Sequence, residues 1–225
     1  NGTAFIEGGA FHPMHSSQFE TVEPFCLDKT EIALGTYMEC VERGSCPRRE
    51  RTVDWPGIRS GEKGKWSVHC NKAASGEPGA PRTRRARGKV DHPVNCVTWV
   101  EAASYCKSVG KRLPTENEWE WAARAGILSP WFTGNSVATL QGYVNFAAAE
   151  ALPEWGRDAT FDDGFLVHTA VDQLMPNPFG LHHVLGNVSE WCADDYAADY
   201  TDAARAGDGL RMAPPGLQKP HRGGS

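Results

Sequence analysis

Oxygen-bearing side chains occur at two points of a long irregular segment, residues 127–175. The first is Asn145, and the second is the aspartate pair of Asp162-Asp163-Gly164-Phe165. A loop of this length in a compact domain needs something to order it, and calcium binds six to eight oxygens from carboxylates, amides and backbone carbonyls. From these residues alone two readings stay open: a calcium site, or an Asp-Gly turn with Asn145 capping a strand.

Sulfur chemistry is the second possibility. Seven cysteines could form up to three disulfides and leave one thiol: Cys26, Cys40, Cys46, Cys70, Cys96, Cys106 and Cys192. None are spaced as Cys-x-x-Cys, which argues against a zinc knuckle or a thioredoxin-like redox site. Cysteine-rich loops without metal spacing favour an oxidising compartment. We therefore expect an extracytoplasmic location, whether periplasmic, secreted or surface-exposed.

Basic residues concentrate in the run Pro-Arg-Thr-Arg-Arg-Ala-Arg-Gly-Lys at 81–89. Such a run can bind nucleic acid or heparin, but here no helix arrays the arginines and no aromatic residues are interleaved. We interpret residues 46–91 as a solvated loop insertion whose ends are tethered by Cys46 and Cys70. The net charge of −5 gives no overall reason to expect a nucleic-acid partner.

Other polar residues have simpler interpretations. The adjacent His182 and His183 alternate faces on an extended segment, so they cannot easily chelate one metal, and we interpret both as structural. His92, next to a proline, is also more typical of a structural residue than of a ligand. The acidic residues after Trp191 are most simply a solvated face: Asp194, Asp195, Asp199 and Asp202.

The elements that must position these groups include two short helices with strong start signals. Pro114 and the pair Thr115/Glu118 predict a helix that begins at about Glu116, because each side chain of such a capping box satisfies an amide at the helix start. An apolar stripe indicates that this helix is half-buried, and Gly126 stands where a left-handed C-terminal cap is expected. A second box, Thr98/Glu101, predicts a helix that ends at Gly110.

The rest of the chain predicts strands and loops. Residues 4–11 and 22–28 read as extended runs, and residues 34–43 as a helix closed by Gly44. With 24 glycines, 15 prolines and few helical stretches, the composition indicates a loop-rich α+β domain. The length fits one domain spanning 1–225, and no apolar run is long enough to cross a membrane.

Three stretches, in register along the chain, resemble the sulfatase-modifying factor family, whose namesake is the formylglycine-generating enzyme. They are Arg112–Glu120, Gly186–Trp191 and Arg222–Ser225. The resemblance implies a C-type-lectin-like fold, with a small antiparallel sheet, two short helices and long loops.

The resemblance also implies metal ligands. A first calcium would be held by the Asn145 side chain, the Phe146 carbonyl, the Asp163 carboxylate and the Phe165 carbonyl. A second calcium would use the carbonyls of Gly186 and Val188 and the carboxylate of Glu190. His183 stands where the family usually has an oxygen-bearing side chain, and imidazole is a poor calcium ligand, which weakens the second site.

Two features bear on catalysis. Ser189 replaces a tryptophan that, in the oxidase of this family, helps to wall the reactive pocket. The cysteine pair that holds copper there follows the serine that corresponds to Ser225. We therefore expect that the closing strands and this pair lie outside the 225 residues. Within them no catalytic residue is visible, and only Ser189 and Ser225 adjoin the pocket.

Three functions remain open at this point. The first is non-catalytic recognition of a protein or peptide, with calcium as the only cofactor. The second is a copper-dependent oxidase that converts a sulfatase cysteine to formylglycine, with its cysteine pair after Ser225. The third is an accessory domain in a larger signalling or surface protein. We prefer the first because nothing visible requires chemistry, and the remaining C-terminal segment of the protein is a further candidate partner.

Overall fold

The computed structural model describes residues 2–14, 16, 18–49, 52–53, 58–71, 89–146, 163–165, 167–196, 200, 204–212 and 218–224. The chain divides into two compact units, which we describe separately. Unit 1 comprises Asn1–Thr30, Leu113–Val167 and Asp172–Ser225, and unit 2 comprises Glu31–Arg112 and His168–Val171.

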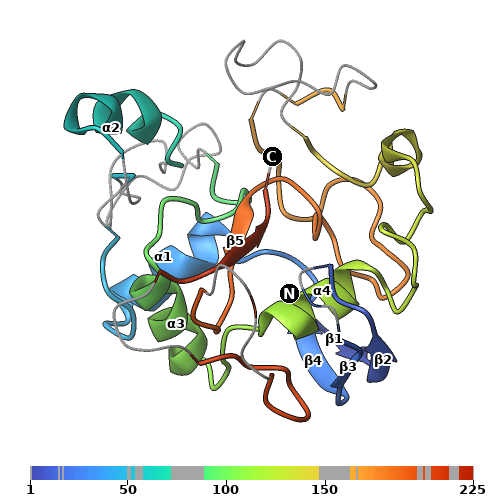
Figure 1. The fold of residues 1–225 in the computed structure, drawn as a ribbon. Helices are drawn as coiled ribbons and strands as arrows, with labels where there is room; N and C mark the ends of the chain where they lie inside the picture. The colour runs from blue at the N-terminus through green and yellow to red at the C-terminus, as the bar shows by residue number, and fades with distance from the viewer. Residues whose placement is uncertain are drawn as a thin grey trace. The chain divides into compact units, whose positions relative to one another are not determined.

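Unit 1 contains three antiparallel strand pairs among its described residues. Strand β1 (Thr3–Ile6) pairs with β4 (Phe25–Asp28), β2 (Gly9–Phe11) with β3 (Glu20–Val22), and β5 (Ser189–Trp191) with β6 (His221–Gly223). Figure 1 shows β1 to β4 beside the helix α4. The α+β class is confirmed, with the difference that the described strands form separate pairs in place of one sheet.

Helix α4 (Glu116–Ala123) begins where the capping box predicts. The Glu118 amide donates to Thr115 Oγ1 over 3.1 Å, and the Thr115 amide donates to Glu118 Oε2 over 2.9 Å. Every residue of the helix is buried, so the prediction of a half-buried helix was wrong. The reason is that its polar side chains have partners from distant segments of unit 1, which periodicity does not reveal. A short 3₁₀ helix, η1 (Val137–Leu140), follows.

The core of unit 1 forms between α4 and the first strands. Trp121 packs against Phe11 with ring centroids 5.4 Å apart, and its indole Nε1 donates to the Glu7 carbonyl over 2.7 Å. A Cβ atom at Gly9 would lie 2.4 Å from the Trp121 ring, so only glycine fits at this position. Burial of each large apolar side chain contributes about 1.5–3 kcal/mol, which makes this contact a main source of the unit's stability.

The regular elements of unit 2 within the described residues are three helices joined by irregular segments. Helices α1 (Leu34–Glu42) and α3 (Trp99–Ser108) pack together through Tyr37 and Tyr105, whose rings stack 5.8 Å apart. Both halves of the Thr98/Glu101 box form at the start of α3, as predicted. Helix α2 (Ser60–Ser67) lies within the expected insertion and buries none of its residues. None of the helices in the described ranges has the length and hydropathy that a membrane crossing needs.

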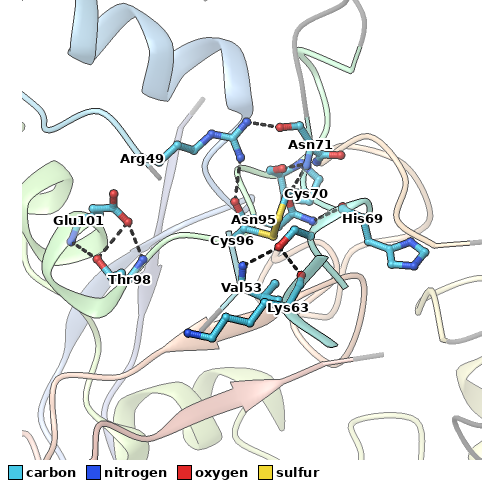
Figure 2. Close-up of a disulfide and its surroundings, with 12 residues drawn as sticks. Arg49, Val53, Lys63, His69, Cys70, Asn71, Asn95, Cys96, Thr98 and Glu101 are labelled. Carbon is cyan, nitrogen blue, oxygen red and sulfur yellow. Dashed lines mark hydrogen bonds between the residues drawn. A yellow bond between two sulfur atoms is a disulfide. The ribbon is translucent and has the colours of Figure 1, made fainter. Parts of the chain in front are cut away.

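Two disulfides fasten unit 2, Cys40–Cys46 and Cys70–Cys96. The first joins Cys46, at the start of the segment 46–91, to α1, and the second joins Cys70, in the middle of the segment, to Cys96, which lies after its end. Cys26, Cys106 and Cys192 take no part in them. Figure 2 shows the buried Arg49 beside the second disulfide, where Nη1 donates to the Asn95 carbonyl over 2.9 Å and Nη2 to the Asn71 carbonyl. The order here comes from disulfides and polar hydrogen bonds, neither of which has a periodic sequence pattern.

Candidate metal centre

Asn145 lies at the centre of the first predicted calcium site and is fully buried. Its amide nitrogen donates to the Val167 carbonyl over 3.2 Å and to Asn187 Oδ1 over 3.0 Å. Two donated bonds fix the amide orientation, and Oδ1 is left with no hydrogen-bond partner among the described residues. A buried amide oxygen without a partner is unfavourable unless something else satisfies it, and a bound cation is one such group.

Asp163 brings together the two backbone segments that would supply carbonyl ligands. Its Oδ2 accepts from the Phe146 amide over 2.6 Å, and its Oδ1 accepts from the Phe165 amide over 2.8 Å. Asn145 adjoins Phe146 in sequence, so all four predicted ligand residues lie on segments joined through one carboxylate. This oxygen-rich set has the hard donors that calcium prefers.

The segment containing Gly186 and Asn187 packs closely against the Asn145 backbone. A Cβ atom at Gly186 would lie 2.3 Å from the Asn145 carbonyl oxygen, which also accepts from the Asn187 amide over 2.8 Å. Gly186 is therefore required for the close approach of the two backbones. Asn187 itself adopts a left-handed conformation with φ of 67°, which asparagine tolerates better than most residues.

The second predicted site has weaker geometric support. The Gly186 carbonyl already accepts from the Val188 amide over 2.8 Å. Glu190 Oε2 accepts from Trp119 Nε1 over 2.8 Å, and burial raises the pKa of Glu190 to about 7, opposed in part by this bond. The hydrogen bond from Trp119 thus occupies one oxygen of the carboxyl group that the second site would use. His183 is buried with φ of 56°.

Ser189 begins β5 and has an exposed side chain. It faces Gly223 of β6 in the strand register, and a Cβ at Gly224 would lie 2.9 Å from its Oγ. Ser225 lies outside the described residues. The start of β5 thus presents a small polar side chain beside two glycines.

Sequence reasoning missed a buried polar network at the start of α4. Asp194 is fully buried, so its assignment to a solvated face was wrong. Its Oδ2 accepts from the Glu116 amide over 2.8 Å and its Oδ1 from the Arg211 amide over 2.9 Å. Glu116 forms an ion pair with Arg222 and accepts from the Tyr200 hydroxyl over 3.1 Å. The available signal was the set of unsatisfied amides that every helix start presents.

The other aspartates after Trp191 differ from Asp194. Asp195 forms an ion pair with Lys219 over 2.6 Å, and Asp199 and Asp202 lie outside the described residues. The network around Asp194 therefore ties the segment after β5 and the segment containing Arg211 to the same helix. Its role is structural, because both carboxylate oxygens of Asp194 accept from backbone amides.

The described cysteines do not fit a copper(I) site. Burial raises the pKa of the Cys192 thiol well above its usual range, and the nearby Glu116 and Asp194 carboxylates raise it further, so the metal-free thiol is protonated at neutral pH. Cys40, Cys46, Cys70 and Cys96 are already paired in the two disulfides, and Cys26 is exposed on β4. Cys192 is thus a protonated, buried side chain.

The sequence model of the family described as "Sulfatase-modifying factor enzyme 1-like domain" matches residues 1–225. The chain therefore belongs to this family, as its motifs predict. It is 37% identical over 139 residues to the formylglycine-generating enzyme of Bos taurus, covering 60% of this chain and 35% of that protein. It is 35% identical over 199 residues to the inactive C-alpha-formylglycine-generating enzyme 2 of Bos taurus, covering 79% of this chain and 62% of the relative.

The fold has solved counterparts. PvdO from Pseudomonas aeruginosa superposes with a TM-score of 0.64 at 21% identity, covering 99% of this chain and 81% of that one. This likeness concerns the fold alone. The chain spans about a third of the length of the active bovine relative and less than two thirds of the inactive one. The family to which the chain belongs thus includes both active and inactive members.

Proposed function

We propose that this chain is a non-catalytic recognition domain for a protein or peptide, located outside the cytoplasm. The observation that carries the proposal is Ser189, whose exposed side chain stands where the family resemblance places a pocket-walling tryptophan. A serine there leaves an open surface in place of an indole wall. The similarity to an inactive relative supports a domain that uses this surface without chemistry.

The strand pair that bears Ser189 suits an extended peptide. Among the described residues, β5 and β6 pair only with each other, so each has an outer edge. An extended peptide can add to such an edge through main-chain hydrogen bonds, and its side chains then confer specificity. The two glycines after Arg222 have no side chains that would block a peptide beside this strand pair.

Calcium would order the backbone around Asn145, which is hydrogen-bonded to Asn187, two residues before Ser189. Its ligands would be the Asn145 side chain, the Phe146 and Phe165 carbonyls and the Asp163 carboxylate. The bound ion would neutralise Asp163 and satisfy the buried Asn145 oxygen. We propose the second set, Gly186, Val188 and Glu190, only as a weaker site. The two disulfides support placement in an oxidising compartment.

The test separates recognition from oxidation. The full-length protein is incubated with oxygen, copper and a Cys-x-Pro-x-Arg peptide, and the peptide is followed by mass spectrometry. We expect the cysteine to stay unchanged at every copper concentration. Formation of formylglycine in proportion to the protein would overturn the proposal.

A binding experiment then locates the surface. Peptides selected from a displayed library on the wild-type protein are expected to lose binding to Ser189→Trp, because an indole fills the low surface. Ser45→Trp, an exposed position in unit 2, is the matched control and should bind as wild type. Equal binding by the wild type and Ser189→Trp would exclude the β5 surface as the site.

The second candidate function is the copper-dependent oxidase. The 37% identity to the bovine formylglycine-generating enzyme favours it. On this reading, the two copper-binding cysteines would follow Ser225, since the described cysteines do not fit. Copper-dependent turnover in the peptide assay would select this function.

A further inference from the structure

Two histidines from distant parts of the chain meet inside unit 2. Nδ1 of His92 and Nδ1 of His168 are 2.8 Å apart, and the rings are nearly perpendicular with centroids 4.9 Å apart. One nitrogen must carry a proton and donate while the other accepts, so this bond requires that at least one ring be neutral. Two imidazolium rings at this distance would repel each other and lose the bond.

The pair lies where the backbone of unit 2 is tied together. Helix α1 has Ala33 at its start and no side-chain cap. Its first amides donate instead to backbone carbonyls, Leu34 to His92 and Gly35 to Val90, each over 2.8 Å. Residues 90–92 therefore supply the cap that the α1 sequence lacks.

The same residues also hold the short segment 168–171. The Val171 amide donates to the Asp91 carbonyl over 3.0 Å, and the His168 ring is hydrogen-bonded to His92, the residue that follows Asp91. This segment is the only part of unit 2 that comes from beyond residue 112, and it directly follows Val167 of unit 1. Its attachment in unit 2 thus depends on contacts to residues 91 and 92.

Three further charged or titratable groups act on the pair. Lys89 acts on both histidines, Asp91 on His92, and His69 on His168. Lys89 and His69 disfavour protonation, whereas Asp91 favours it. The ring of His69 points away from the neighbouring Cys70–Cys96 disulfide (Figure 2). The surroundings of His168 therefore oppose a positive charge.

We propose that His92 and His168 form an acid-sensitive latch, which fastens residues 168–171 and the start of α1 to residues 89–92 at neutral pH and opens as the pH falls. We define the latch as this histidine pair with the Val171, Leu34 and Gly35 hydrogen bonds.

The direction of the pH effect follows from the sign of the pKa shifts. Burial lowers the pKa of His168 to about 3, and Lys89 and His92 contribute; burial and then Lys89 lower the pKa of His92. The open state binds protons more readily, with a pKa near the ordinary 6.5. The closed latch is therefore fully stable above about pH 6.5 and loses stability as the pH falls toward 3. For each histidine, the equilibrium constant for opening rises by up to about tenfold per pH unit.

Native-state hydrogen exchange of the whole protein, with calcium in excess, tests the latch one amide at a time. After correction for the intrinsic pH dependence of exchange, protection of the Val171, Leu34 and Gly35 amides should fall below about pH 6 by about tenfold per pH unit for each histidine that takes up a proton on opening. The His182 amide of unit 1, which donates to Lys29, is the internal control and should keep its protection.

Variants connect the effect to the pair. Asparagine places an amide near the Nδ1 position without titrating, so the double variant His92→Asn/His168→Asn should have protection at Val171 that no longer depends on pH. His69→Asn is the matched control and should keep the pH dependence. The latch is excluded if Val171 protection is constant between about pH 7 and pH 5 in the wild type, or falls equally in the double variant.

A second measurement does not need the variants to fold. Ring NMR titration of the wild type should give His168 a pKa well below the ordinary histidine value. A value at or above 6.5 would overturn the proposal.

Discussion

The two compact units differ first in charge. By sequence, unit 1 has 7 basic and 19 acidic residues, a net charge of −12, whereas unit 2 has 16 basic and 9 acidic residues, a net charge of +7. They also differ in what fastens them. Unit 2 contains both disulfides, and unit 1 contains the buried ion pairs around α4 and the oxygen-rich site at Asn145 and Asp163.

This difference indicates that the long loops of the two units are ordered in two ways, by the proposed cation in unit 1 and by disulfides in unit 2. An excess of carboxylates favours a bound cation, because the ion reduces repulsion and gains charged ligands. A basic, arginine-rich segment has no such option, and covalent cross-links order it instead. Each prediction below removes one stabilising interaction, an ion pair, a disulfide or a helix cap, and compares it with a matched interaction or with the other unit.

The largest effect is expected from a buried ion pair in unit 1. Arg211 pairs with Glu20 and donates to Asn117 Oδ1 over 3.3 Å, and its side chain is only 2% exposed. Arg211→Met would leave a buried carboxylate without its cation and should lower the free energy of unfolding by about 3–5 kcal/mol. Urea unfolding followed by tryptophan fluorescence measures it.

The control for this prediction is Arg205→Met in the same unit. Arg205 also pairs with an aspartate, Asp208, but its side chain is 60% exposed, so the loss should be below about 1 kcal/mol. Equal losses in the two variants would mean that burial does not strengthen the Arg211 pair.

The next effect concerns the disulfides of unit 2. The Cys70–Cys96 bridge closes 26 residues and the Cys40–Cys46 bridge closes 6. Loop-closure entropy predicts that the double serine variants lose about 3.5 and about 2 kcal/mol, respectively. Hydrogen exchange of α2 and α3 amides, with unit 1 amides as reference, checks both values. The reverse order would contradict an entropic origin.

The smallest effect compares the two capping boxes. Thr98→Ala in unit 2 removes one cap and should destabilise by about 1 kcal/mol. Thr115→Ala in unit 1 also removes a hydrogen bond to the Asp208 carbonyl from a buried hydroxyl, so the loss should reach about 2 kcal/mol. Chemical denaturation of the two single variants provides the measurement, and a larger loss for Thr98→Ala would refute the ranking.

Local signals made part of this structure predictable. The capping boxes at Thr98 and Thr115 predicted the starts of α3 and α4, and the two predicted extended runs, residues 4–11 and 22–28, overlap the first four strands. These features depend on residues close in sequence. The candidate ligands Asn145, Phe146, Asp163 and Phe165 came from the family resemblance, which reflects long-range structure that a single sequence does not express.

The rest depends on contacts between distant residues. Asp194 looks like one acid in a solvated run, yet it caps α4 from 78 positions away. The Arg49 hydrogen bonds and the His92–His168 pair have no periodicity or motif. Polar side chains satisfied by far segments therefore carry information that appears only once the chain is folded.

The account depends most on the calcium site of unit 1, and thermal unfolding of the metal-stripped protein tests it directly. Calcium at about 100 times its dissociation constant should add about 2.7 kcal/mol and raise Tm by roughly 5–10 °C. Asn145→Leu, which keeps the branched shape of the side chain but removes the amide oxygen, should abolish this increase. An identical Tm with calcium and with chelator in the stripped wild-type protein would contradict the account.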